Sequence, residues 1–336
     1  MSFKSISACN CVLFVVQLPL FKAEYKGICS LKKIAVIDLG SNSVRMSIFD
    51  AEKPQKEIKA FRGVIRLSEG MGAELMLQPK AQERAVNALS EYKKIIENED
   101  VEAYVAVATA AVRTAVNQAE FLKLVKGRTG ININVIDGTT EAALDALAVS
   151  QRLKCESGVI CDIGGGSTEL ISVGCDAPDM ISIPYGSGRI CESFFAHGES
   201  ANSVKEALEF ADKQLLLVPW LDKFKGTSLV GIGGTIRAVA RLGASRALRQ
   251  TAESIELTPD EVEKTLRLIE SADLKSRLAM PEIGKDRADI IMGGVVLLRA
   301  VLKRLAPKKI IVADIGVREG VLFDLIQNRG ILKINE

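Results

Sequence analysis

Two stretches of the chain share one pattern of apolar and polar positions. In each, an apolar run leads into a turn of small residues, and a second run follows in which apolar positions alternate with polar ones. The first stretch is KIAVIDLGSNSVRMSIFD, with its turn at 40–43, and the second is GVICDIGGGSTELISV, with its turn at 164–167. Period-two alternation on either side of a short turn is typical of a β-hairpin. We therefore expect a hairpin at each stretch.

The two hairpins match one another position by position. Three pairs of residues share a separation of 124, the difference between 162 and 38: Asp38 and Asp162, Gly40 and Gly164, Ser43 and Ser167. A repeat at this spacing is of domain length and predicts two copies of one fold that face each other. The alternative is that Asp-x-Gly after a strand is simply a common turn sequence.

Strands and helices alternate through the rest of the chain. The apolar periodicity predicts a helix over 79–98, a strand at AYVAVAT, a helix from about 111 and a strand at ININVID. A helix follows over TTEAALDALAVSQRL, with Thr139 or Thr140 as its cap. This alternation is typical of an α/β fold built in layers.

The second half of the chain repeats the alternation less regularly. SLVGIGGTIRAVARL indicates a strand, a glycine turn and a helix, and KKIIVADIGVREGVLFDLIQ a strand that runs into a last helix. Two further helices are predicted at DEVEKTLRLIESA and ADIIMGGVVLLRAVLKRL. No low-complexity linker separates these segments.

Composition narrows the possible functions. With 336 residues, 48% of them apolar and 26% charged, the chain is long enough for two domains, and its net charge of +2 favours neither nucleic acid nor an anionic membrane. The seven cysteines form an odd set without C-x-x-C spacing, so we expect reduced, mostly buried thiols. The chain has a single histidine, His197, which argues against Ser-His-Asp triads and multi-histidine metal sites. We expect His197 to lie in a surface loop.

The first residues are interpreted as an extension. CVLFVVQLPLF, residues 11–21, has the length of a signal-peptide core, but Pro19 interrupts it and no clear cleavage site follows. The run is too short to span a bilayer. We expect residues 1–31 to lie outside the core, with a weak membrane-targeting role as the alternative.

The glycine turns have the composition of anion sites. A turn of Gly, Ser and Thr exposes several backbone N–H groups to one phosphate, and larger side chains would block the approach. A third such turn, GIGGTIRA, precedes a helix, although glycine there can serve geometry alone. The expected phosphate-binding residues in these turns are Ser41, Asn42, Ser43, Gly164, Gly165, Gly166, Ser167, Thr168, Gly233, Gly234 and Thr235.

Carboxylates beside these turns need a separate explanation. An aspartate repels phosphate unless a cation lies between them, so Asp162 and Asp38 predict a Mg²⁺ ion held through oxygen ligands. The simpler alternative is that each aspartate only stabilises its turn.

Several motifs together resemble a known family. IDLGSNSVRM, RLSEGM, VATAAVRTAVN, VIDGTTEA, DIGGGSTEL, GIGGTIRA and DIGVREGVLFDL occur in the order found in the exopolyphosphatase and guanosine pentaphosphate phosphohydrolase (Ppx/GppA) family. This family lies within the superfamily of actin, Hsp70 and sugar kinases. The resemblance implies two ribonuclease-H-like α/β domains with the active site in the cleft between them, here residues 32–138 with 315–336, and 139–314.

The resemblance also implies roles for individual residues. The catalytic base of the family falls on Glu141 and its phosphate-binding arginine on Arg113, while its loop carboxylates fall on Asp162 and Glu169, as catalytic residues and metal ligands. Without the resemblance, Glu141 reads as an acid that favours the helix N-terminus, and Arg113 as half of a surface ion pair. The chain departs from the family at Thr139 and Thr140, where acidic residues are usual.

The implied reaction is Mg²⁺-assisted attack of water on the terminal phosphate of polyphosphate or guanosine pentaphosphate. Two alternatives stay open: an ATP-dependent kinase of the same superfamily, and a non-catalytic sensor of polyphosphate or an alarmone. Candidate polyphosphate tracks are RLGASRALRQ and LKRLAPKK. We further expect a cytoplasmic protein, a short form without the HD domain of longer members, and a homodimer by family analogy, with no nucleic acid bound and no stable membrane association.

Overall fold

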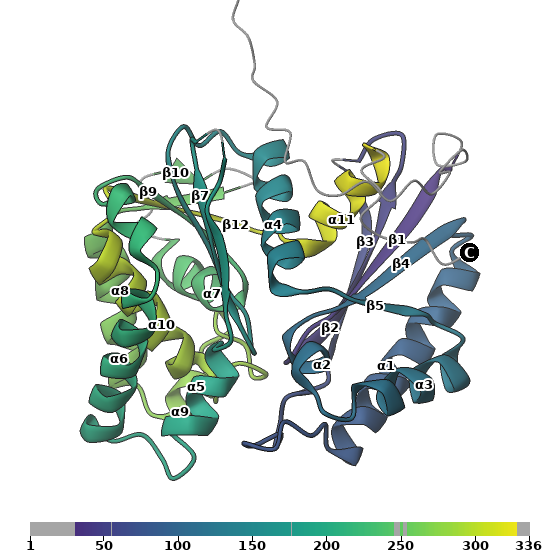
Figure 1. The fold of residues 1–336 in the computed structure, drawn as a ribbon, viewed down its shortest axis with the longest axis horizontal. Coiled ribbons are helices and arrows are strands. Elements are labelled where there is room, and N and C mark those ends of the chain that lie inside the picture. Colours follow the sequence, from purple (N-terminus) through teal and green to yellow (C-terminus); the bar gives the residue numbers. More distant parts are fainter. Residues whose placement is uncertain (1–30, 55, 176, 245–248, 251–253, 328–336) are drawn as a thin grey trace, which may run out of the picture.

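The structure is a computed structural model that describes residues 31–54, 56–175, 177–244, 249–250 and 254–327. Two lobes, each built on one β-sheet, make up the described chain, and helices α4 (Gly138–Arg152) and α11 (Val317–Ile326) lie between them (Figure 1). The expected extension falls outside the described residues, apart from Leu31. None of the described helices is long and apolar enough to cross a membrane.

The first lobe carries a five-stranded sheet in the order β3-β2-β1-β4-β5. Strand β1 is antiparallel to β2 and parallel to β4. Helices α1 and α3 cover one face of the sheet through a single apolar cluster. The elements of this lobe are β1 (Lys33–Leu39), β2 (Ser43–Asp50), β3 (Glu57–Val64), α1 (Pro79–Asn98), β4 (Ala103–Ala108), α2 (Ala110–Thr114), α3 (Gln118–Thr129) and β5 (Ile133–Val135).

The second lobe carries a seven-stranded sheet in the order β10-β11-β12-β9-β6-β7-β8. Its helices, apart from α4, cover the face turned away from the first lobe. The elements are β6 (Gly158–Ile163), β7 (Thr168–Val173), β8 (Met180–Ile183), α5 (Ser187–Phe194), α6 (Ala201–Leu216), η2 (Pro219–Phe224), β9 (Ser228–Ile232), α7 (Gly234–Gly243), β10 (Arg249–Gln250), β11 (Ser254–Leu257), α8 (Pro259–Ser271), α9 (Leu274–Leu278), α10 (Ile291–Leu305) and β12 (Lys309–Ala313).

The two sheets repeat one topology. Read from β8, the second sheet runs β8-β7-β6-β9-β12, with an antiparallel meander followed by two parallel neighbours, as β3-β2-β1-β4-β5 does in the first. This is the strand order of the ribonuclease-H-like fold, and β11 and β10 extend it only at one edge. The predicted fold class, two such α/β domains with a cleft between them, is confirmed.

Helix α4 connects the lobes because its apolar side chains serve two cores. Leu144 packs with β1 and α11 in a cluster of the first lobe, whereas Ala142 and Val149 pack on the second sheet. Helix α11 lies against α4 and β1, so the end of the described chain returns to the first lobe. The exact domain boundaries given above stay a prediction.

Some local predictions were wrong. Asp137, rather than Thr139 or Thr140, caps α4, because its side chain accepts a hydrogen bond from the N–H of Thr140 at 2.7 Å. Helix α10 begins at Ile291, since the residues before it form a turn.

His197 is exposed in a turn, as predicted, and two of the four described cysteines, Cys161 and Cys191, are buried.

Candidate active site

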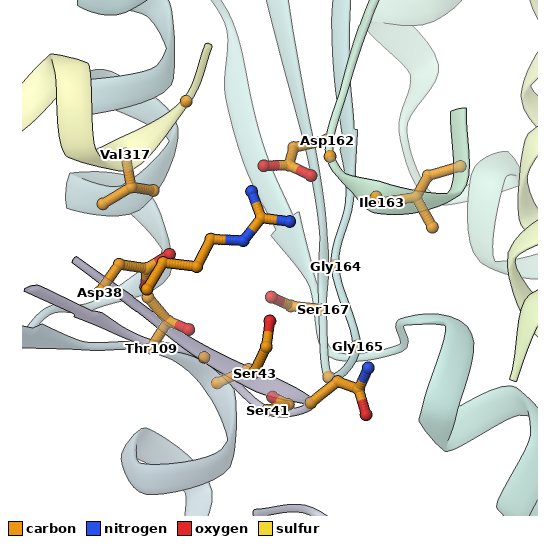
Figure 2. Close-up of a pocket in the computed structure, with 18 of the residues that line it drawn as sticks. Asp38, Ser41, Ser43, Thr109, Asp162, Ile163, Gly164, Gly165, Ser167 and Val317 are labelled. Atoms are coloured by element: carbon orange, nitrogen blue, oxygen red, sulfur yellow. The ribbon is translucent and has the colours of Figure 1, made fainter. Parts of the chain in front are cut away.

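Strand alternation places the two matched aspartates in the cleft. In β1, Ile34 and Val36 face α4 and α11, and Asp38 follows at the same parity. In β6, Ile160 faces α4, and Asp162 lies two residues further along the same face. Each carboxylate therefore lies near the end of its strand on the inner face, and the two oppose each other across one pocket (Figure 2).

The two turns close with the same hydrogen bond. The N–H of Gly40 donates to the carbonyl of Ser43 at 3.1 Å, and the N–H of Gly164 donates to the carbonyl of Ser167 at 3.0 Å. Both turns line the pocket, where Ser43 and Ser167 point toward each other. The pocket has about 770 Å³ of space between its walls, including its open mouth.

Glycine is required in the second turn because the two turns nearly touch. A Cβ atom on Gly166 would lie 2.5 Å from Oγ of Ser41 and 2.9 Å from Cβ of Ala110. A Cβ atom on Gly165 would lie 3.2 Å from Cβ of Ser41. Side chains there would separate the lobes or fill the space between the turns.

The third glycine turn closely approaches two side chains of the pocket. Gly233 has a φ of +86°, and a Cβ atom there would lie 2.0 Å from Oδ1 of Asp162. A Cβ atom on Gly234 would lie 2.1 Å from the guanidinium of Arg287. Both glycines line the pocket, so this turn borders the pocket and also lets Asp162 and Arg287 approach.

Four arginines of the pocket were missed in the sequence analysis: Arg45, Arg237, Arg287 and Arg318. Burial and the neighbouring arginines lower the pKa of Arg45 to about 9 and that of Arg287 to about 10. Crowded, partly desolvated cations of this kind favour a bound polyanion. Three of them had a sequence signal: Arg45 lies directly opposite Asp38 in the hairpin, and Arg237 and Arg318 belong to the motifs GIGGTIRA and DIGVREGVLFDL. Arg287 had none.

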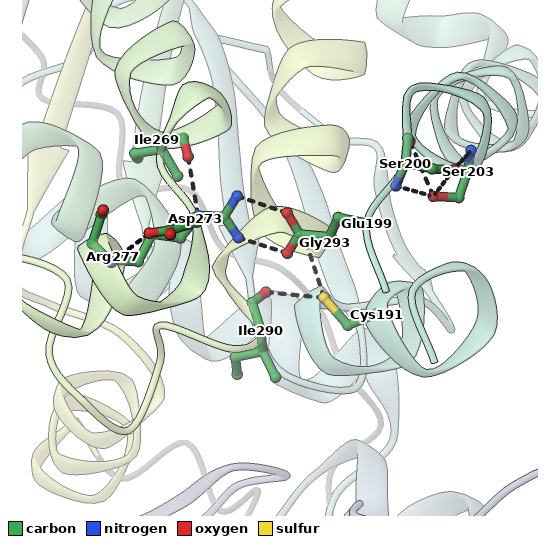
Figure 3. A network of polar contacts seen from close by, with 10 residues as sticks. Cys191, Glu199, Ser200, Ser203, Ile269, Asp273, Arg277, Ile290 and Gly293 are labelled. Atoms are coloured by element: carbon green, nitrogen blue, oxygen red, sulfur yellow. Dashed lines mark hydrogen bonds and ion pairs between the residues drawn. The ribbon is translucent and has the colours of Figure 1, made fainter. Parts of the chain in front are cut away.

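Arg287 belongs to an irregular segment, residues 279–290, that is anchored at both ends. Figure 3 shows the two anchoring contacts. Before it, the buried Arg277 donates to both carboxylate oxygens of Glu199, at 2.6 and 2.7 Å. After it, Sγ of Cys191 accepts from the N–H of Gly293 at 3.2 Å and donates to the carbonyl of Ile290 at 3.5 Å. The segment therefore presents Arg287 from a fixed support.

The same segment bridges the lobes. Asp286 forms an ion pair with Arg62, and Asp289 forms one with Arg66. The carbonyl of Asp286 also accepts a hydrogen bond at 3.2 Å from the side-chain amide of Asn42 in the first turn. Arg287 thus lies between two contacts that join the walls of the pocket.

Glu141 enters the pocket from the first turn of α4 and is 7% exposed. Its Oε2 accepts a hydrogen bond at 2.7 Å from Arg113, which also donates to the carbonyl of Ile136 at 3.1 Å. Burial raises the pKa of Glu141 to about 7, although Arg113 opposes that change, and the nearby Asp162 and Asp38 add to it. A carboxyl group with this pKa changes protonation near neutral pH.

Burial also raises the pKa values of the other acids of the site. Burial raises the pKa of Asp162 to about 6, while Arg237 opposes the change. Burial also raises the pKa of Asp38 and holds that of Glu169 well above its usual range. Oδ1 of Asp162 has no hydrogen-bond partner in the described chain. Such a group fits a cation ligand, because an unsatisfied buried carboxylate oxygen is costly.

Four of the predicted site residues do not line this pocket. Glu169 is buried behind it and accepts from Oγ of Ser182 at 2.6 Å. The hydroxyl of Thr168 donates to the carbonyl of Tyr185 at 2.8 Å, and Thr235 is fully buried against Gly294. Arg113 lines an adjoining cavity that shares Gly166 and Ser167 with the pocket. The remaining predicted residues all line it: Asp38, Ser41, Asn42, Ser43, Glu141, Asp162, Gly164, Gly165, Gly166, Ser167, Gly233 and Gly234.

Comparisons with known proteins agree with this arrangement. Residues 58–329 match the sequence model of the Ppx/GppA phosphatase family. Exopolyphosphatase 1 of Mycobacterium leprae is 27% identical over 302 residues, which cover 86% of this chain and 88% of that protein. A bifunctional 3-dehydroquinate synthase/phosphatase of Fusobacterium nucleatum is 29% identical over 317 residues; the match covers 88% of this chain but only 47% of that longer protein.

Solved structures show the same architecture. The Aquifex aeolicus member of the Ppx/GppA family superposes with a TM-score of 0.71 at 30% identity, over 90% of this chain and 100% of that one. An exopolyphosphatase from Cytophaga hutchinsonii superposes with a TM-score of 0.82 at 24% identity, over 88% and 98% of the two chains, and supports the fold alone.

Proposed function

The chain belongs to the Ppx/GppA phosphatase family, and on that premise we propose that it releases the terminal phosphate of inorganic polyphosphate by attack of water. The observation that carries the proposal is that matched turns from both lobes line one pocket together with Glu141 and four arginines. Phosphoryl transfer depends mainly on positioning and charge stabilisation. The named exopolyphosphatase relatives support polyphosphate as the substrate.

The chain's own groups would hold the terminal phosphoryl group from two sides. The hydroxyls of Ser43 and Ser167 point into the space between the two turns, and free backbone N–H groups of the turns would add further donors there. Arg45 and Arg287 supply positive charge from opposite lobes, where the oxygens of a phosphate would otherwise be poorly solvated. The neighbouring phosphates would lie toward Arg237 at the pocket wall.

Glu141 is our candidate for the general base. It lies in the pocket wall, its pKa is raised to about 7, and a base of this pKa accepts a proton efficiently at neutral pH. Arg113 orients the carboxylate through one oxygen, Oε2. Its role in this proposal is therefore to position Glu141 rather than to bind phosphate directly.

The carboxylates of the second hairpin fit a divalent cation. Asp162 has an unpartnered buried oxygen beside the phosphate-binding turn, and Asp38 faces it across the pocket. Asp162 and Asp38 would hold Mg²⁺, and Glu169 would support it from behind. When bound, the ion would neutralise phosphate oxygens that these acids otherwise repel.

The test is phosphate release from polyphosphates of graded length and from guanosine pentaphosphate, each with and without Mg²⁺. The proposal predicts Mg²⁺-dependent release from polyphosphate. Release from the nucleotide alone would instead identify an alarmone phosphatase. Binding without turnover would indicate a sensor, and phosphorylation of an acceptor by ATP with no polyphosphate hydrolysis a kinase.

A further inference from the structure

Asp145 is a buried acid that the proposed reaction does not use. It lies on α4 one helical turn after Glu141, its side chain has no exposed surface, and neither carboxylate oxygen has a hydrogen-bond partner in the described chain. Buried polar groups are almost always hydrogen-bonded, and an unpaired buried carboxylate is especially costly. Asp145 therefore needs either a proton or a cation.

The charged groups with the largest influence on Asp145 are all acids. Asp162, Glu169 and Glu141 face it in that order of influence, followed by Asp38, and with burial they hold the pKa of Asp145 well above its usual range. Glu169 is bound by Ser182 and Glu141 by Arg113, whereas Oδ1 of Asp162 has no partner among the described residues. Asp145 and Asp162 thus both have buried carboxylate oxygens that can accept a ligand.

Asp145 lies beside Gly316, a residue that lines the pocket. A Cβ atom on Gly316 would lie 3.7 Å from Oδ1 of Asp145, and Gly316 itself lines the pocket. Because Gly316 has no side chain, only backbone lies beside that carboxylate oxygen on this side. The charges of Asp162 and Asp145 influence each other, so an ion held by Asp162 would attract Asp145.

We propose that Asp145 is an additional carboxylate for the divalent cation at Asp162, and that it binds the ion through one of the ion's water molecules. This rests on the cation in the proposed function. Among the described residues, no three acids or other metal ligands are grouped closely enough to hold an ion directly. Mg²⁺ suits such a site because it keeps several waters and often takes only one or two carboxylates.

The experiment titrates Mg²⁺ alone into the full chain by calorimetry, for the wild type, Asp145→Asn and Asp145→Leu. Groups that orient a metal through its first ligands typically account for about 10- to 100-fold of metal affinity. We expect both variants to bind Mg²⁺ about 10- to 100-fold more weakly than the wild type. Asp324→Asn, a buried acid on the neighbouring helix α11, serves as the matched control and should leave the affinity unchanged.

Thermal unfolding supplies a second readout that does not depend on activity. Without divalent cations, Asp145→Asn should unfold at a higher temperature than the wild type, because the unpaired acid is gone. Added Mg²⁺ should then stabilise the wild type more than the variant. Unchanged Mg²⁺ affinity in both variants would overturn the proposal, as would a variant that is less stable than the wild type with and without Mg²⁺. Failure of the proposed function is separate, since it appears as absent phosphate release by the wild type.

Discussion

The two matched hairpins have the same geometry but differ in charge. In the first, Asp38 lies across the strands from Arg45, and the turn carries polar side chains. In the second, Asp162 lies across from Glu169, and the turn is three glycines. The cross-strand partner thus changes from a cation to an acid at the equivalent position.

This difference suggests a separate role for each hairpin at the pocket. In the first hairpin the positive charge of Arg45 offsets the negative charge of Asp38, so this hairpin can attract an anion directly. The second brings two carboxylates next to bare backbone N–H groups, so it accepts phosphate only when positive charge is supplied. We infer that the first hairpin recognises the anion and that the second makes its binding depend on a cation.

The largest effect is expected from Glu141→Gln, which removes the base and leaves both hairpins intact. Loss of a general base typically costs about 10²- to 10⁴-fold in rate. Phosphate release in single-turnover experiments should fall by that range while polyphosphate affinity is kept. Glu120→Gln, an exposed acid on α3, is the control and should keep full activity. Normal turnover by the Glu141 variant would remove it from the role of base.

Substitution of Arg45 and of Glu169, which occupy equivalent positions in the two hairpins, should distinguish the roles of the hairpins. Arg45→Gln should weaken polyphosphate binding about 10- to 100-fold even without Mg²⁺, since a hydrogen bond to a charged group contributes about 1.5–3 kcal/mol. Glu169→Gln should mainly change the Mg²⁺ concentration needed for binding. Calorimetry with and without Mg²⁺ measures both variants. Equal behaviour of the two variants would contradict the division of roles.

Glycine in the second turn can be tested against glycine elsewhere. Gly166→Ala places a methyl group 2.5 Å from Oγ of Ser41, so polyphosphate affinity should fall several-fold as the turns move apart. In Gly127→Ala, on α3, the methyl group meets no atom within 4 Å, and the exchange should stabilise the helix by about 0.5–1 kcal/mol. Binding and thermal unfolding of both variants check this contrast.

The smallest effect concerns pH. With the pKa of Glu141 raised to about 7, kcat/KM should fall as pH decreases through that value, because the base becomes protonated. Arg113 favours the ionised form of Glu141, so Arg113→Gln should move the acidic limb of the pH–rate profile to higher pH. A pH–rate profile of both proteins measures the direction. A limb that moves to lower pH would contradict the assignment.

Much of this arrangement could be predicted from local pattern. Period-two alternation sends Asp38 and Asp162 to the inner faces. The same rule could have corrected one error, because Thr168 shares its face with Leu170 in the outer core and therefore points away from the pocket. Strand alternation therefore predicts the two pocket aspartates correctly and also shows that Thr168 should not have been included among the phosphate-binding residues.

Other features depended on contacts between distant segments. Arg287 lies in a segment without periodicity, and it reaches the pocket only because separate networks anchor that segment. The pairing of Arg113 with Glu141 joins two helices from different parts of the chain. No local pattern encodes such approaches, so the place of Arg287 in the pocket could not be predicted.

The most direct measurement is a crystal structure of the Glu141→Gln variant with a short polyphosphate and Mg²⁺. The account predicts one terminal phosphoryl group in contact with both turns, 40–43 and 164–167. Polyphosphate bound to only one of the turns, or on a surface outside the pocket, would contradict it.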